Sequence, residues 1–399
     1  MTKTIAWITA TLDQVGGGER LIQEGALYYR SLGYRVLLIT WSYSAEATFD
    51  GEYEERDVIV IGDGGEGKSA ARAFKRLRDV PKLRRVLKEN NVDLVFVQSE
   101  YDVALAYMAT RFSAIPYRFL IFGQMFQFPE DYAKYSLVFR RHLREIVESC
   151  EGYRITTSLV APKLSFVNRW ALEFICIVRF LAVRSAQRRF VFTRQIGWET
   201  KLLYGKEATI AHGAYRRYVA DTPVKNDDVL QKLGLTNKKY ILSLSRLAPK
   251  KRIELIIRAY AQSGIDDLLL VVGGGGSERQ NLEQVAAASG CADRIRFLGR
   301  VADDEMMPLK AGANLFVSMD IGDYDISPLE ALVLGTPIIL PREFDADSQL
   351  GGTPGVTICD ALEGPVAEAM REGRDGTVIA SAKLLDEYSW EYYFSVLAE

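Results

Sequence analysis

The chain has 399 residues, of which 48% are hydrophobic and 26% charged, and its formal net charge is -2 at pH 7. This length predicts two α/β domains of roughly 200 residues each rather than one core. The balanced charge argues against nucleic acid as a partner. The 4 cysteines and 2 histidines lack paired spacing, which argues against a disulfide framework or a zinc site and favours a reducing, cytoplasmic compartment.

The N-terminal residues predict the start of a doubly wound unit, with no signal-peptide pattern before the first strand. That strand is expected at Ile5–Thr9, and Gly16, Gly17 and Gly18 lie between it and a helix that runs to Arg30. Glycines at such a turn let the backbone approach a phosphate or a sugar hydroxyl, and a tight turn without a ligand is the alternative. Further strands are expected at Arg35–Thr40, Val58–Ile61, Asp93–Gln98 and Tyr117–Phe122.

Residues 62–69, GDGGEGKS, match the P-loop pattern of nucleotide hydrolases. Asp63 and Glu66 would place two carboxylates inside the phosphate cradle, and no later apolar strand ends in an aspartate for magnesium. We therefore interpret the match as coincidental. A hydrolase that depends on Lys68 stays an alternative.

Two stretches bear on contact with a membrane. Ala70–Lys88 is basic and predicts two helical segments broken at Pro81, whose polar face either rests on an anionic membrane or stays in solvent. Phe166–Val183 is strongly apolar, but Arg169, Glu173 and Arg179 interrupt it. Each charge in hydrocarbon costs about 2.5 to 3.5 kcal/mol, so we expect a helix packed on the first domain rather than a transmembrane span.

The second half of the chain alternates strands with helices, which predicts a parallel doubly wound sheet. The first domain is expected over 1–215 and the second over 225–386, with the linker and an entry helix in Asp221–Asn237. Strands are expected at Tyr240–Leu244, Leu268–Val272, Ile295–Phe297, Leu315–Val317 and Ile338–Leu340, and helices at Ile253–Gln262, Glu278–Ser289 and Asp304–Gly312.

The last two of these strands enclose a loop suited to ligand binding. They are expected to lie parallel, so the loop Met319–Ser327 should lie at the carboxyl edge of the sheet, where such folds bind ligands. Ser327 followed by Pro328 predicts a helix N-cap whose first-turn N–H groups can hold an anion. Glu330 would be repelled by a phosphate, so we expect it to accept hydrogen bonds from sugar hydroxyls.

These segments resemble, in order, the motifs of the retaining glycosyltransferases of family 4. SRLAPKK at 245–251 is similar to the family's G-R-L-x-P-x-K, and GGGER at 16–20 to its G-G-x-E-R. VVGGG at 271–275, FLG at 297–299 and the loop of 314–340 also match. The resemblance implies the GT-B fold, an α/β architecture of two Rossmann-like domains with parallel doubly wound sheets facing across a cleft. It also implies that a C-terminal helix, 387–399, crosses back to the first domain.

The resemblance further implies roles for individual residues. In the family the matching arginine and lysine hold the donor phosphates, which assigns that role to Arg246 and Lys251, and Glu330 is expected to bind the ribose. The nucleotide is expected to contact the remaining matched positions, which are Gly273, Gly275, Leu298, Asp325, Ile326, Ser327, Pro328 and Leu329. Because positive side chains neutralise the diphosphate, no metal cofactor is expected.

The sequence departs from the family at the first glutamate of its E-x7-E pattern. Gly322 occupies that position, and the adjacent Asp323 is the candidate substitute for contact with the donor sugar. The alternative is that Asp323 and Asp325 form the D-x-D metal motif of the other large glycosyltransferase fold. Gln124 lies where many members have a histidine, so only hydrogen bonding to a sugar hydroxyl is expected of it.

The expected function is that of a retaining, metal-independent enzyme. It would move a hexose from a GDP- or UDP-sugar to a glycan or lipid-linked acceptor in the synthesis of cell-surface glycans, by front-face substitution. The first domain would meet the acceptor, and the region from His212 to Val224 would be the hinge. A cytoplasmic location, with contact to the inner face of the membrane as one option, is expected. A sugar-nucleotide epimerase of the same fold and a non-catalytic binding relative are the alternatives.

Overall fold

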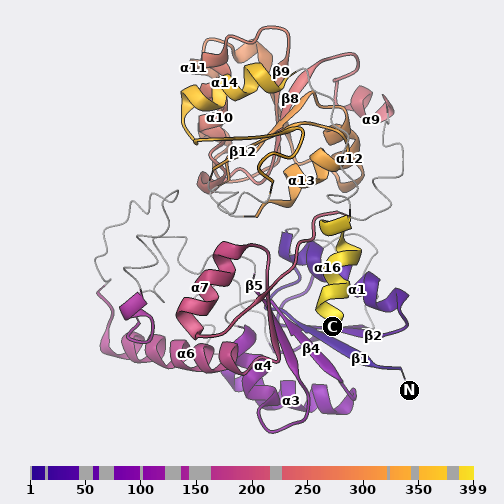
Figure 1. Cartoon of the computed structure of the whole chain (residues 1–399), viewed down its shortest axis with the longest axis vertical. Coiled ribbons are helices and arrows are strands. Elements are labelled where there is room, and N and C mark those ends of the chain that lie inside the picture. The colour runs from indigo at the N-terminus through magenta and orange to yellow at the C-terminus, as the bar shows by residue number, and fades with distance from the viewer. Residues whose placement is uncertain are drawn as a thin grey trace. The chain divides into compact units, whose positions relative to one another are not determined.

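The computed structural model describes residues 2–13, 17–44, 57–62, 76–98, 102–121, 136–142, 163–215, 227–320, 324–342, 350–374 and 386–399. The chain divides into two compact units (Figure 1). Unit 1 comprises Met1–Ala211 and Phe394–Glu399, and unit 2 comprises His212–Tyr393. The last helix, α16 (Trp390–Ala398), therefore begins in unit 2 and ends in unit 1.

Unit 1 contains a parallel sheet of 7 strands in the order β3-β2-β1-β4-β5-β6-β7. Every residue of β1 is buried, as expected for a parallel sheet that is covered on both faces. The chain order reverses between β1 and β4, so the loops that follow these two strands diverge. The strands are β1 (Thr4–Ile8), β2 (Arg35–Thr40), β3 (Val58–Val60), β4 (Leu94–Val97), β5 (Tyr117–Ile121), β6 (Arg188–Val191) and β7 (Thr209–Ile210).

One layer of helices on this sheet consists of α3 (Val80–Glu89), α4 (Asp102–Thr110) and α6 (Phe166–Ser185), with α4 in contact with both others. α7 (Arg194–Tyr204) also contacts α6. The basic stretch does not break at Pro81 as predicted. The chain turns in a short 3-10 helix, η2 (Leu77–Asp79), and Pro81 lies in the first turn of α3, where a missing N–H costs nothing.

Aromatic side chains join α1 (Gly17–Ser31) and the end of α16 to the sheet of unit 1. The rings of Tyr29 and Phe96 stack with their centroids 5.4 Å apart, and the Tyr29 hydroxyl donates a hydrogen bond of 3.1 Å to the carbonyl of Phe394. Burial raises the pKa of Tyr29. Arg118 of β5 donates to the carbonyl of Leu397, which satisfies a carbonyl at the C-terminal end of α16. These contacts fix the last residues of the chain in unit 1.

Unit 2 contains a parallel sheet of 6 strands in the order β10-β9-β8-β11-β12-β13, which confirms the predicted doubly wound arrangement. The chain order reverses between β8 and β11. Apolar residues cover both faces of the sheet in two separate clusters. The strands are β8 (Tyr240–Leu244), β9 (Leu269–Gly273), β10 (Ile295–Gly299), β11 (Leu315–Val317), β12 (Ile338–Pro341) and β13 (Val356–Cys359).

The helices of unit 2 agree with the predicted ones to within the uncertainty of their ends. The predicted entry helix is α9 (Asp227–Lys232). Among the described residues after β11, α14 (Glu363–Gly373) is the one helix that the sequence analysis did not predict. The others are α10 (Ile253–Ser263), α11 (Arg279–Ala288), α12 (Asp303–Ala311) and α13 (Ile326–Val333). Each connects consecutive parallel strands, as this topology requires.

None of the described helices is sufficiently long and apolar to pass through a bilayer. α6, the most apolar stretch of the sequence analysis, buries Leu172, Ile175 and Cys176 in unit 1. This confirms that it packs on the first unit.

Candidate functional site

The carboxyl ends of β8 and β11 lie side by side at the point where the strand order of unit 2 reverses. The two strands pair directly, with Leu315 beside Ile241 and Phe316 beside Leu242. In open α/β sheets a ligand binds in the crevice at such a position. The loop after β8 carries the predicted phosphate-binding residues, and the loop after β11 leads into α13. The topology therefore brings together two motifs that are far apart in the sequence.

Lys251 is held between two carboxylates at this edge of the sheet. Its Nζ lies 2.5 Å from Oδ2 of Asp320 and 3.7 Å from Oδ2 of Asp325. Ser318 donates a hydrogen bond of 2.8 Å to the same oxygen of Asp325. Burial disfavours the charged ammonium, but the attraction of Asp325 and Asp320 outweighs it and raises the pKa of Lys251. Lys251 is therefore charged at neutral pH and fixed in place from the neighbouring loop.

Arg246 is exposed, in contrast to Lys251, and its guanidinium forms no ion pair within the described part of unit 2. Lys250 lies in the same electrostatic environment. Burial lowers the pKa of Lys250, Asp320 opposes this effect, and the like charges of Lys251 and Arg246 add to it. Among the described residues, Arg246, Lys250 and Lys251 therefore lie near enough to Asp320 and Asp325 at this edge to influence one another electrostatically.

Glycines at the end of β9 and after it also lie at this edge. The positions where a neighbouring backbone requires glycine are not the two that the sequence analysis assigned to the nucleotide. A Cβ on Gly274 or Gly276 would lie 1.9 Å or 2.1 Å from a carbonyl oxygen of the loop after β8. These two glycines, which the sequence analysis did not single out, therefore allow that loop to pack closely. A Cβ on Gly273 would meet Leu244, whereas one on Gly275 would meet nothing within 4 Å. The space beside Gly275 is open, as its predicted contact with a nucleotide requires.

The start of α13 corrects one prediction. The sequence predicts Ser327 as the N-cap and Pro328 as the first helical residue, but α13 begins earlier and Asp325 occupies the N-cap position. Its side chain makes no capping hydrogen bond, because the carboxylate accepts from Ser318 instead. The expected role of the N–H groups of Ser327–Leu329 in facing phosphates stays a prediction.

Glu330 is paired with a lysine that the sequence analysis missed. Lys310 of α12, with a side chain only 2% exposed, forms an ion pair with Oε2 of Glu330 in α13. No hydrogen bond engages Oε1 of Glu330 among the residues that the structure describes, so one acceptor remains for a ligand hydroxyl. No sequence pattern marks a helical lysine as the partner of a distant glutamate. The apolar neighbours Pro308 and Leu309, which are also buried, are the one local sign that Lys310 lies inside the unit.

Leu298 lies in β10 and is half-buried against the core of unit 2. Contact between its main chain and a base stays a prediction. His212 packs against aromatic rings of unit 2, with its ring stacked on Tyr388 at 4.9 Å and parallel to Tyr324 at 6.4 Å. Burial raises the pKa of the Tyr324 hydroxyl, which exchanges hydrogen bonds with the backbone of Gly213.

The corresponding edge of unit 1 contains Gly17 and Gly18 at the start of α1. Gln98, which follows β4, donates a hydrogen bond of 3.3 Å to the carbonyl of Gly18. Asp102 at the start of α4 is fully buried and accepts a hydrogen bond of 3.0 Å from the N–H of Ala10. The topology therefore places the predicted glycines at the reversal point of this sheet as well.

Several predicted residues lie outside the described ranges, namely Gly16, Lys68, Gln124, Gly322 and Asp323. The D-x-D alternative depends on Asp323 and is not tested. Within the described residues, no group of three or more histidine, cysteine, aspartate or glutamate side chains could hold a metal ion.

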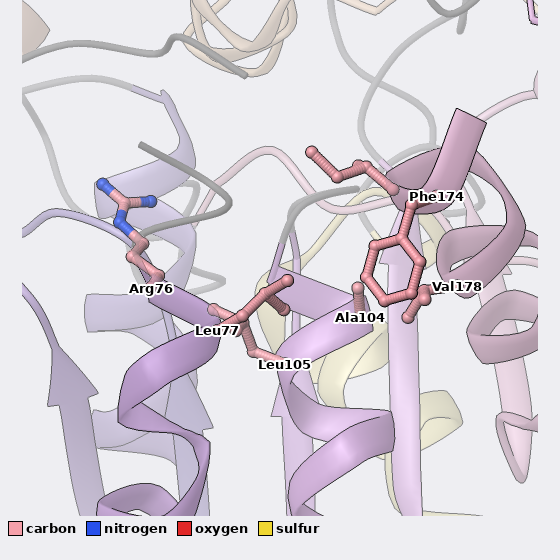
Figure 2. Close-up of a pocket in the computed structure, with 7 residues that line it drawn as sticks. Arg76, Leu77, Ala104, Leu105, Phe174 and Val178 are labelled. Carbon is pink, nitrogen blue, oxygen red and sulfur yellow. The ribbon is translucent and has the colours of Figure 1, made fainter. Parts of the chain in front are cut away.

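A small apolar pocket in unit 1 is not part of this site (Figure 2). Phe174 and Val178 of α6 face Ala104 and Leu105 of α4 across it. Arg76, the one charged residue among the described lining residues, lies over the ring of Trp41 with a separation of 5.7 Å. Because no described lining residue is an acid or a nucleophile, we interpret the pocket as a packing space between helices.

Comparison with family models finds two matches. Residues 15–161 match the model described as "Glycosyltransferase Family 4", and residues 225–344 match "Glycosyl transferases group 1". Each match contains the motifs of one unit.

Among curated proteins, the chain is similar to a GDP-mannose-dependent alpha-(1-6)-phosphatidylinositol monomannoside mannosyltransferase of Mycolicibacterium smegmatis. The two are 25% identical over 281 residues, which cover 65% of this chain and 70% of that protein.

Among solved structures, HepE of Anabaena in complex with UDP and glucose has a TM-score of 0.71 at 15% identity, covering 99% of this chain and 98% of that one. Sucrose-phosphate synthase of Thermosynechococcus elongatus has a TM-score of 0.69 at 14% identity, covering 99% and 97%. At these identities the likeness shows the fold alone.

Proposed function

Because the chain belongs to the family 4 glycosyltransferases of the GT-B fold, we propose that it transfers a hexose from a nucleotide-diphosphate sugar to a lipid-linked or glycan acceptor. The proposed reaction retains the configuration of the anomeric carbon and needs no metal ion. GDP-mannose is the first donor to test, since the curated relative depends on it. A UDP-sugar is the second.

The observation that carries this proposal is the charged edge of unit 2. Lys251 is fixed and positively charged, and Arg246 next to it is exposed and without an ion pair in the described part of the chain. A guanidinium can bind two phosphate oxygens at once, and an ammonium supplies a point charge. Together they suit a diphosphate that gains negative charge as it leaves.

The ribose of the donor is assigned to Glu330. Its ion pair with buried Lys310 fixes the carboxylate and offsets its charge, so that it can lie near a nucleotide phosphate with less repulsion. The remaining oxygen can accept hydrogen bonds from ribose hydroxyls, as the acidic residue of dinucleotide-binding folds does.

In the proposed step, the bond between the anomeric carbon and the diphosphate oxygen breaks. The acceptor oxygen forms its bond to the same face of that carbon, and its proton passes to the departing phosphate oxygen. The cations stabilise the negative charge of the leaving group, which is the main contribution that the described residues can make. This mechanism needs no enzymic nucleophile.

A lipid-linked acceptor is supported by the outer face of α6, which we define by the exposed apolar residues Phe166, Val167, Trp170, Ile177 and Leu181. Phe166 is 78% exposed and Trp170 65%. Apolar side chains at helical spacing on one exposed face are typical of a helix that lies in a membrane interface. Exposed cations on α3, in the same helical layer, suit an anionic surface.

The direct test of the donor is a thermal-shift screen with GDP, GDP-mannose, UDP and UDP-glucose. A ligand at a hundredfold excess over its Kd stabilises the folded state by about 2.7 kcal/mol, so a bound donor should raise the Tm clearly. Transfer is then followed with radiolabelled sugar and a membrane lipid extract, with and without EDTA, and the anomer of the product is read by NMR. If no nucleotide or nucleotide sugar raises the Tm, the proposal is wrong.

A further inference from the structure

Asp320 carries an acceptor that the described protein leaves unused. Its side chain lies in the loop after β11, and the residue is only 4% exposed. Oδ2 binds Lys251 at 2.5 Å, whereas Oδ1 is buried and has no hydrogen-bond partner in the described part of the chain. Buried polar atoms in folded proteins are nearly always paired, because an unpaired one destabilises the fold. The unused oxygen therefore requires an explanation.

We propose that Oδ1 of Asp320 accepts a hydrogen bond from a hydroxyl of the donor's sugar ring, so that Asp320 helps to determine which sugar is transferred. This inference rests on the function proposed above and extends it to a residue of the loop Met319–Ser327 to which the sequence analysis gave no individual role. Asp320 does not take part in the proton transfer.

The position of Asp320 follows from its contact with Lys251. In a nucleotide-diphosphate sugar, the sugar is bonded directly to the terminal phosphate. The hydroxyl next to the anomeric carbon therefore lies close to whatever side chain binds that phosphate. Because Oδ2 of Asp320 touches the phosphate-binding ammonium, the second oxygen of the same carboxylate lies within reach of the ring.

A purely structural role for Asp320 would leave Oδ1 unexplained. Holding Lys251 requires only Oδ2, and Asp325 already provides a second carboxylate 3.7 Å from the same ammonium. The Asp325 carboxylate differs from that of Asp320 in having a second partner, because its Oδ2 also accepts a hydrogen bond from Ser318. The sequence has Gly322 where the family's sugar-binding glutamate would be, and Asp320 is a second candidate acceptor beside the predicted Asp323.

The charge of Asp320 indicates the class of sugar. A carboxylate accepts hydrogen bonds from hydroxyl groups and repels another carboxylate in a poorly solvated site. We therefore expect a neutral hexose, and we expect a uronic acid donor to bind no more tightly than its nucleotide alone.

The test uses the Asp320→Asn variant of the full chain, because asparagine keeps the shape and still accepts from Lys251. Calorimetric Kd values are measured for GDP, GDP-mannose, UDP and UDP-glucose. Asp320→Asn should weaken the preferred sugar nucleotide about tenfold to a hundredfold, as for a hydrogen bond to a charged group, and should change the Kd of the nucleotide alone less than threefold. Equal losses for both ligands would overturn the inference, since Asp320 would then act only through Lys251.

Asp325→Asn is the matched control, because it removes the other carboxylate near Lys251. Its effect should be equal for the nucleotide and the sugar nucleotide. A loss confined to the sugar nucleotide in Asp325→Asn, with none in Asp320→Asn, would contradict our assignment.

A second measurement starts with the wild-type protein, so its first result does not depend on how well a variant folds. Monodeoxy analogues of the preferred donor are titrated into the wild-type protein, and one analogue should bind about tenfold to a hundredfold more weakly than the parent. In Asp320→Asn that same analogue and the parent should bind equally. If all analogues match the parent in the wild-type protein, the inference is wrong while the proposed function stands. If neither GDP nor UDP binds, the proposed function fails and this inference fails with it.

Discussion

The two units of this protein share one sheet topology but use its reversal point differently. In unit 1, Arg20 pairs with Glu24 at 2.9 Å and Asp102 accepts a hydrogen bond from the backbone of Ala10. In unit 2, Lys251 is held by two aspartates and Arg246 extends to solvent. Among the described residues, unit 2 thus presents an exposed cation without an ion pair at this position, whereas Arg20 of unit 1 is paired with a carboxylate.

This difference shows that the topology supplies a position and the loops supply the chemistry. The unit 1 edge has glycines that permit close approach but no excess of positive charge among its described residues. In our proposal this edge meets the acceptor, and Arg246 and Lys251 at the unit 2 edge stabilise the leaving diphosphate. Four predictions can break or sharpen the comparison between the two units.

The largest effect is expected for Glu330→Ala, which leaves the buried Lys310 ammonium without its carboxylate. Breaking a buried ion pair from one side typically costs about 3 to 5 kcal/mol, and urea unfolding should show a loss of that size. The double variant Lys310→Met with Glu330→Leu should recover most of the stability, because no charge is then left buried. A stable single variant would show that Lys310 is not held by Glu330.

Arg246→Ala should have the next largest effect, on activity rather than on stability. Loss of one group that stabilises the leaving charge typically lowers kcat about 10² to 10³-fold, or about 2.7 to 4 kcal/mol. The Tm should stay unchanged, since Arg246 is exposed and forms no ion pair in the described part of unit 2. The control is Arg258→Ala on α10. Arg258 forms an exposed ion pair with Glu254, so its loss should lower the free energy of unfolding by only about 0.3 to 0.5 kcal/mol. Equal activity in both variants would contradict the role of Arg246.

Much of this fold follows from the sequence because buried parallel strands are short apolar runs that alternate with helices. β8 and β11 were predicted with their observed ends, Tyr240–Leu244 and Leu315–Val317. β13 was missed, since Val356–Cys359 contains a threonine and most of it is only half-buried. The N-cap of α13 was placed too late because Ser327 and Pro328 form a strong local signal. The hydrogen bond between Ser318 and Asp325 depends on tertiary structure.

Candidate site residues that belong to motifs could be named from the sequence, whereas residues that contact them only in the folded chain could not. Arg246, Lys251 and Glu330 follow from the resemblance to the family. Lys310 and Asp320 do not, because their importance arises only when a helix or a loop brings them to those residues. A pattern in one sequence records spacing along the chain and not such contacts.

A packing test in unit 1 should give a smaller effect. A Cβ on Gly25 of α1 would lie 2.4 Å from Trp7 and 2.9 Å from Phe394, so Gly25→Ala should destabilise the protein by about 1 to 3 kcal/mol through overpacking. The control is Gly364→Ala on α14, where a Cβ meets nothing within 4 Å and the better helix propensity should add up to about 1 kcal/mol. Urea unfolding followed by tryptophan fluorescence measures both. If the two variants change stability in the same direction, α1 is not packed against Trp7 as described.

The smallest expected effect concerns the outer face of α6. Trp170→Ser should weaken binding to vesicles of anionic phospholipid about tenfold, which corresponds to about 1.4 kcal/mol, because an interfacial tryptophan loses its apolar contact. Lys82→Glu on α3 should weaken binding to the same vesicles by about 1 to 2 kcal/mol, since it replaces an attractive charge with a repulsive one, and should have no effect on neutral phosphatidylcholine vesicles. Sedimentation with vesicles measures both. If Trp170→Ser leaves binding unchanged while Lys82→Glu abolishes it, the contact is purely electrostatic and α6 does not enter the interface. Unit 1 would then reach a membrane through charge alone, and the exposed apolar residues of α6 would require a protein partner instead.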